Sequence, residues 1–126
     1  MPDTQHTMDA SADMNDLRMS EAARPLYDHV RKFIKETVNP MSEEFHRLGE
    51  GKTDIWSYAP GQLECLEKAK DEAKKQGLWN FFLPDAETGE GLSNLDYAYI
   101  AAELGKNPMA SETMNCSAPD TGNMEV

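Results

Sequence analysis

The run Leu78-Trp79-Asn80-Phe81-Phe82-Leu83 is the most apolar stretch of the chain, and Pro84 follows it directly. Six such residues could form a buried strand, but the sequence holds no second strand-like run that could pair with it. We therefore expect an extended or single-turn segment inside an all-α protein. Its rings, Trp79, Phe81 and Phe82, are expected to anchor the core, because three aromatic side chains in four positions bury large apolar areas.

The sequence before this run has the periodicity of two amphipathic helices. A first helix is predicted over 24–38, with an apolar face formed by Leu26, Val30, Phe33, Ile34 and Val38. Pro40 should end or kink it, and 41–48 could continue as a second short turn. The segment 49–61 is predicted to be a loop pinned by Trp56 and Tyr58. A second helix over 62–76 should end at Gly77 and has a thin face formed by Leu63, Leu66, Ala69 and Ala73.

The sequence after the run predicts a third helix and shorter ones. Ser93 and Asp96 have the spacing of a capping box for a helix over 94–104. Its buried stripe would consist of Tyr97, Ile100, Ala101 and Leu104. At least two of the aromatic rings should lie between Ile100 and Leu104 of this helix and Leu66 and Ala73 of the second. Asn107 can cap a fourth helix that continues through Met114. Asp120 can cap a fifth helix that has scarcely begun at the last residue, so we expect the domain to be truncated at its C-terminal end.

The composition limits the core and the partners. Leu, Ile, Val and Phe make up 20 of the 126 residues, so we expect the core to be completed by residues outside this chain. The net charge of -11 disfavours nucleic acid and membrane surfaces as partners, and the basic stripe Arg31, Lys32 and Lys35 is interpreted as a solvated face. Residues 1–20 are expected to form a flexible acidic tail without a targeting signal, before a helical domain over 21–126. Two cysteines without paired spacing agree with a cytoplasmic protein.

Three local patterns could carry chemistry, and each has a simpler explanation. Glu43 and His46 form half of a di-iron motif, but the second half is missing, so a surface histidine is the better interpretation and no metal site is expected. Cys65 and Cys116 have no histidine nearby in the sequence to act as a base, so no catalytic residue is expected. The glycines of 89–94 lack the strand that a dinucleotide fingerprint requires.

Four segments carry a resemblance to a known family. They are Phe33-Ile34-x-x-x-Val38-x-Pro40, Ala73-x-x-x-Gly77-Leu78-Trp79-Asn80-Phe81-Phe82-Leu83-Pro84, Gly91-Leu92-Ser93-Asn94-Leu95-Asp96-Tyr97 with Ala102-Glu103-Leu104-Gly105, and Asn115-Cys116-Ser117-Ala118-Pro119-Asp120-Thr121-Gly122-Asn123-Met124-Glu125-Val126. In this order they resemble the N-terminal helical domain of a flavin-dependent acyl-CoA dehydrogenase. The last segment is the most specific and is similar to the subfamily of acyl-CoA dehydrogenase family members ten and eleven.

The resemblance implies a parent enzyme that binds FAD and converts acyl-CoA to trans-2-enoyl-CoA by α,β-dehydrogenation. In the family, a β-rich middle domain and a C-terminal helical bundle hold most of the flavin site and the glutamate base. The resemblance therefore implies that this chain is inactive alone and holds no cofactor-binding residue. A homo-oligomer and electron transfer flavoprotein as the electron acceptor are implied for the full-length enzyme.

By position in the family pattern, the chain would contribute one wall of the slot that binds the acyl group. The candidate substrate-binding residues are Thr113, Met114, Asn115 and Ser117. The alternative is a stand-alone helical interaction module without catalysis.

Overall fold

The computed structural model describes residues 17–82 and 90–117. In these two ranges the chain forms helices and loops without a strand, as the sequence predicts for an all-α protein. The elements in order are η1 (Glu21–Ala23), α2 (Arg24–Phe33), η2 (Ile34–Val38), α3 (Asn39–Leu48), α4 (Gln62–Lys75), α5 (Asn94–Leu104) and α6 (Pro108–Thr113). The predicted fifth helix and most of the predicted tail lie outside the described residues.

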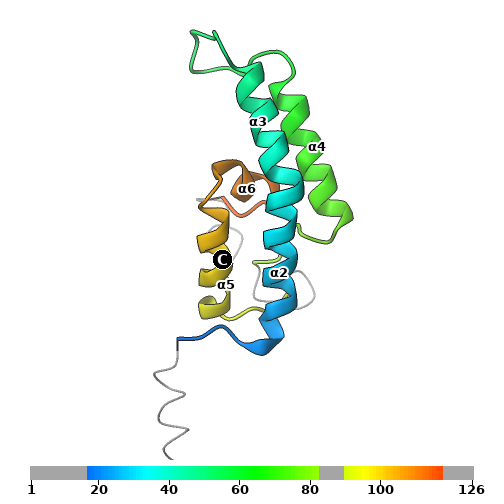
Figure 1. Ribbon diagram of the computed structural model, residues 1–126, viewed down its shortest axis with the longest axis vertical. Helices are drawn as coiled ribbons and strands as arrows, with labels where there is room; N and C mark the ends of the chain where they lie inside the picture. The colour runs from blue at the N-terminus through cyan, green and yellow to red at the C-terminus, as the bar shows by residue number, and fades with distance from the viewer. Residues whose placement is uncertain (1–16, 83–89, 118–126) are drawn as a thin grey trace, which may run out of the picture.

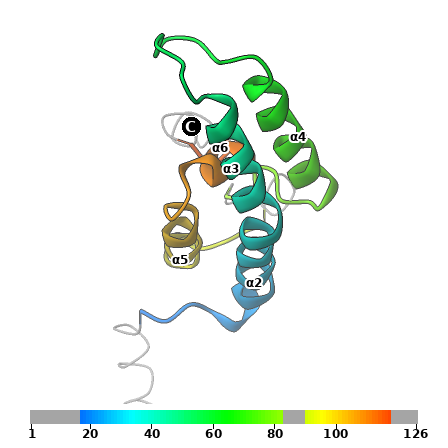
Figure 2. The same ribbon diagram turned by 45° about the horizontal axis from the view of Figure 1, so that its top comes forward.

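The helices form a long rod with shorter helices packed against it. α2, η2 and α3 follow one another as one continuous rod, and α4 returns beside α3 (Figure 1). α5 lies beside α2, and the short α6 contacts α4, α5 and η2 (Figure 2). Within the described ranges, no helix has the length and apolar character needed to cross a membrane.

The rod contains a π-helical turn, and Pro40 does not end the helix after Val38, which is one of the two outcomes (an end or a kink) that the sequence predicts. In η2 the N–H of Asn39 donates to the carbonyl of Ile34, five residues earlier. Pro40 lies in the first turn of α3, which follows without a break. Because the wider turn changes the hydrogen-bond pattern at this point, the missing N–H of proline is tolerated and the rod continues to Leu48.

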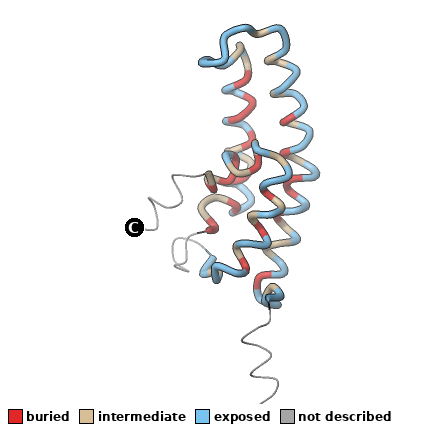
Figure 3. Tube along the Cα trace, turned by 90° about the vertical axis from the view of Figure 1, so that its left-hand side faces the viewer, coloured by how far each residue is buried: buried red, intermediate tan, exposed pale blue. Residues whose placement is uncertain are grey.

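The core lies where the rod meets the 78–82 segment, α5 and α6. Red segments on facing sides of the tube in Figure 3 mark these buried residues. The cluster consists of Val30, Phe33, Ile34, Val38, Ala73, Leu78, Phe81, Phe82, Ile100, Leu104, Ala110, Met114 and Cys116. Phe81 and Phe82 are buried as predicted, whereas Trp79 is only half-buried, with the Lys74 ammonium 4.5 Å from the centre of its ring.

The buried face of α4 differs from its prediction at Leu63, Gln62 and Cys65. Leu63 is 51% exposed, because the buried stripe of α4 begins at Gln62 and continues through Cys65 and Leu66. The Gln62 amide Nε2 donates to the carbonyl of Phe45 at 2.9 Å and its Oε1 accepts the Ala59 N–H at 2.7 Å. These bonds tie the loop to both helices.

The aromatic residues of this loop behave differently from one another. Tyr58 meets Phe45 edge to face, with 6.1 Å between the ring centres. Trp56, however, is 90% exposed, so the prediction that it pins the loop is wrong. The Asp54 carboxylate instead orders the loop, because it accepts the Trp56 N–H and the Ser57 hydroxyl.

Both predicted caps of the later helices are present. The Ser93 hydroxyl accepts the Asp96 N–H at 3.1 Å at the start of α5, and the Asn107 side chain accepts the Met109 N–H at 3.1 Å at the start of α6. In the stripe of α5, Ile100 and Leu104 are fully buried. Tyr97 and Ala101 are half-buried at its edges.

Candidate functional site

The candidate substrate residues lie together on the turn that ends α6, which we call the α6 turn (residues 113–117). The N–H of Asn115 donates to the Glu112 carbonyl at 3.2 Å, and the N–H of Cys116 donates to the Ser111 carbonyl at 2.8 Å. This pair of bonds is a Schellman motif, which requires a left-handed residue directly after the helix. Asn115 supplies it, with φ of 58°.

The structure divides the four candidates into two groups. Thr113 and Met114 have no exposed surface, and the Thr113 hydroxyl donates to the Met109 carbonyl at 2.7 Å. Asn115 and Ser117 are half-buried, so part of each side chain lies at the surface. A molecule that approaches the α6 turn would therefore meet Asn115 and Ser117 first, with Thr113 and Met114 behind them.

A second left-handed asparagine faces the α6 turn. Asn80, with φ of 60°, accepts a hydrogen bond from the Asn115 side-chain amide and donates its own N–H to the Met114 carbonyl at 3.3 Å. We did not select Asn80 from the sequence. Its signal is a polar residue inside the most apolar run, at a position where asparagine tolerates the left-handed conformation better than other side chains do.

Cys116 is the cysteine within the α6 turn, and it is buried. Its thiol donates to the Met114 carbonyl at 3.4 Å. Desolvation by burial raises the pKa of Cys116 to about 12. Because the thiolate is the reactive form, this cysteine is a packing residue and not a nucleophile at neutral pH.

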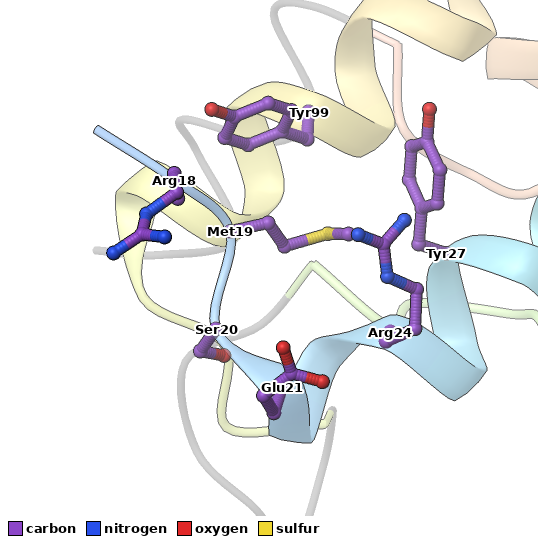
Figure 4. A pocket seen from close by; sticks show the side chains of 7 residues that line it. All are labelled: Arg18, Met19, Ser20, Glu21, Arg24, Tyr27 and Tyr99. Carbon is purple, nitrogen blue, oxygen red and sulfur yellow. The ribbon is translucent and has the colours of Figure 1, made fainter. Parts of the chain in front are cut away.

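An open, polar hollow of about 790 Å³ lies between the segment before α2, the start of α2 and α5 (Figure 4). It is lined by Arg18, Met19, Ser20, Glu21, Arg24, Tyr27 and Tyr99. The guanidinium carbon of Arg24 lies 5.7 Å from the centre of the Tyr27 ring. The lining has an arginine on either side of Glu21 in the sequence, beside Met19 and the two tyrosines, so charged and apolar groups are mixed in it.

The carboxylate of Asp96 binds Ser20, one of the residues that line this hollow. Asp96 accepts the Ser20 N–H and the Ser20 hydroxyl, both at 2.8 Å. The backbone bond from Ser20 is the largest cause that lowers the pKa of Asp96, and the hydroxyl bonds from Ser20 and Ser93 add to it against the opposing effect of burial. This contact fixes the segment before α2 to the start of α5.

The half di-iron motif on α3 gains no partner from the fold. Glu43 and His46 are both exposed, and His46 lies edge to face with Phe45, with 5.9 Å between ring centres. In residues 17–82 and 90–117, no three His, Cys, Asp or Glu side chains are grouped so that they could hold a metal ion.

Comparison with known proteins gives a consistent set of relatives, although no protein-family profile matches the chain. Acyl-CoA dehydrogenase family member 10 of Mus musculus is 42% identical over 113 residues, which cover 86% of this chain and 10% of the relative. Acyl-CoA dehydrogenase family member 11 of Homo sapiens is 44% identical over 100 residues, which cover 77% and 12%. An acyl-CoA dehydrogenase homologue of Mycobacterium tuberculosis, FadE2, is 52% identical over 114 residues, which cover 88% and 26%.

A solved structure agrees with these sequence matches. An acyl-CoA dehydrogenase homologue from Mycobacterium abscessus superposes with a TM-score of 0.67 at 36% identity, over 85% of this chain and 27% of that protein. The chain thus spans from 10% to 26% of the length of the curated relatives named above. Its helical architecture and its sequence together place the chain in the acyl-CoA dehydrogenase family, where it corresponds to the N-terminal helical domain.

Proposed function

We propose that the chain is part of a flavin-dependent acyl-CoA dehydrogenase that converts acyl-CoA to trans-2-enoyl-CoA, and that it forms one wall of the acyl slot. The observation that carries the proposal is the 42–52% identity to named members of the family over most of the chain. FAD as cofactor, electron transfer flavoprotein as acceptor and a homo-oligomeric enzyme belong to the same proposal, because they are properties of the family.

Within this proposal the α6 turn is the wall. Asn115 and Ser117 would contact the acyl group, because their side chains are partly exposed, whereas Thr113 and Met114 would support them from the core. A wall of this kind selects substrates by volume, and an added or missing methylene in an apolar slot changes kcat/KM by about 10- to 200-fold.

The described residues do not fit a complete flavin site. A flavin dinucleotide needs a flat apolar surface for its ring system beside hydrogen-bond donors for its pyrophosphate. The hollow of about 790 Å³ is polar, and the apolar hollow of about 440 Å³ between α3 and α4 is bordered by Glu44, Glu64 and Lys68, whose summed charge is negative and disfavours phosphate. We therefore derive no step of the reaction through the flavin from this chain.

The proposal is tested in the full-length protein that contains this chain. Ser117→Leu adds volume at the α6 turn, so the preference for long over short acyl-CoA substrates in kcat/KM should fall by about tenfold or more. Thr53→Leu is the matched control, because Thr53 is exposed on the loop between α3 and α4. Equal profiles for the two variants would disprove the wall, and a wild-type protein that oxidises no acyl-CoA would disprove the enzyme assignment.

A further inference from the structure

We infer that Asn80 is a positioning residue for the acyl slot: its side chain holds Asn115 and thereby sets the acyl-chain preference without touching substrate. This inference rests on the proposed function, and it concerns a residue that lies 35 positions before its partner. The two side chains form one amide-to-amide hydrogen bond between the core segment 78–82 and the α6 turn.

α4 and α6 end in the same way but use different left-handed residues, Gly77 and Asn115. α4 ends in the same Schellman motif as α6, with Leu78 N–H bonded to the Ala73 carbonyl at 2.8 Å, and there the left-handed residue is Gly77. Glycine is the least strained residue for this conformation. Asparagine also tolerates it, and at the same place in α6 Asn115 adds a side chain that bonds Asn80, which a glycine could not do.

The position of Asn80 is fixed independently of this bond. Its neighbour Phe81 is 1% exposed, and Leu78 has no exposed surface. The N–H of Asn80 also donates to the Met114 carbonyl, so the segment is attached to the α6 turn by its backbone as well. The Asn80 side chain is thus a rigid acceptor against which the Asn115 amide is aligned.

The hydrogen bond between Asn115 and Asn80 positions a residue of the α6 turn that lies partly at the surface. Asn115 is one of the two candidates with exposed atoms, and Ser117 follows it after one buried residue. Without the bond, the Asn115 side chain is no longer aligned by the core segment 78–82, although the Schellman bonds and the Asn80 N–H still hold the backbone of the α6 turn. We therefore expect a looser wall that distinguishes acyl chains less well.

Substitutions at position 80 separate the side-chain contact from the backbone conformation. Asn80→Gly keeps the left-handed backbone and removes the acceptor, whereas Asn80→Asp keeps an oxygen that accepts from Asn115. Asn115→Gly removes the donor and relaxes its own backbone. Asn94→Gly is the matched control, because Asn94 is exposed at the start of α5.

The experiment uses the full-length protein and measures kcat/KM for a long and a short acyl-CoA, together with the melting temperature. Asn80→Gly and Asn115→Gly should each change the long-to-short ratio by about two- to tenfold, the range of one neutral hydrogen bond. The double variant should change it no further, and Asn80→Asp should keep the ratio of the wild type.

Two results would overturn the inference while the proposed function stands. One is an active Asn80→Gly variant with a lowered melting temperature and an unchanged ratio, which would make Asn80 merely structural. The other is an Asn80→Asp variant that behaves as Asn80→Gly does. A wild-type protein that oxidises no acyl-CoA would instead refute the proposed function, and with it the role of Asn80 in selectivity.

Discussion

Phe81 and Trp79 are neighbours in the same aromatic run, but the fold uses them differently. Phe81 is 1% exposed in the core cluster, while Trp79 is half-buried beneath Lys74. We predict that Phe81→Ala lowers the free energy of unfolding by about 3 to 5 kcal/mol, and that Trp79→Ala lowers it by less. Urea unfolding followed by circular dichroism measures both.

If Phe81→Ala does not fold, a milder substitution at the same position can be measured in its place. Phe81→Leu keeps most of the apolar volume and should cost no more than about 1.5 kcal/mol. The assignment of the core is wrong if Trp79→Ala proves more destabilising than Phe81→Ala in the same buffer.

The free energy of unfolding should depend on pH through Asp96. Its pKa is lowered in the folded chain, chiefly by the Ser20 N–H, so its stabilising contribution is present above the unfolded pKa of about 3.9 and is lost as the pH falls through the lower folded pKa. We predict that Asp96→Asn costs about 1 to 3 kcal/mol at neutral pH and much less in acid. Denaturation curves across this pH range check the prediction, and an equal cost at every pH would contradict it.

The two glycines that follow α4 and α5 provide a test of how each helix ends. Gly77 has φ of 74°, whereas Gly105 is right-handed and an added Cβ there would lie 3.5 Å from the Ala101 carbonyl, an ordinary contact. Gly77→Ala should therefore cost about 1 to 2 kcal/mol, and Gly105→Ala should be neutral or stabilising by up to about 1 kcal/mol. Thermal unfolding of the two variants distinguishes these effects; equal shifts of the melting temperature would show that α4 does not end as described.

At the scale of helices, local signals in the sequence predicted most of the fold. The caps Ser93 and Asn107 and the left-handed Gly77 lie where their spacing indicates, because these interactions span only a few residues. The errors come from packing. Pro40 stays inside a helix because a π turn precedes it, and the exposure of Leu63 follows from the face that α4 turns toward α3.

The candidate site was less accessible to sequence reasoning than the helices were. The four residues of the α6 turn came from a family resemblance, and their role as a slot wall stays a prediction. The contact between Asn80 and Asn115 joins two segments through tertiary packing, so no periodicity or local motif indicates it.

At the scale of the whole molecule, the chain corresponds to one helical part of proteins that are much longer than it is. The relatives named above exceed its length several-fold, and the proposed function assigns most of the flavin site to the remainder of such an enzyme. We predict that the purified 126-residue chain, mixed with FAD, retains no stoichiometric flavin after gel filtration and forms no enoyl-CoA. The full-length protein is the positive control, and yellow flavin bound to the short chain would contradict the domain assignment.

The π turn η2 makes the rod tolerant of a change in chain length. Val30, Ile34, Val38 and Ser42 are all buried at intervals of four, although each such interval advances about 40° around a regular α-helix. The π turn has more residues per turn, so it reduces this rotation of the buried face. The rod therefore contains one residue more than a regular helix would need to keep the same residues buried. Deletion of the exposed Glu36 should convert η2 to regular helix while Ser42 still faces Asn107, 3.4 Å away in the present structure. A one-residue gap between relatives at this place would then leave the packing of both halves of the rod intact.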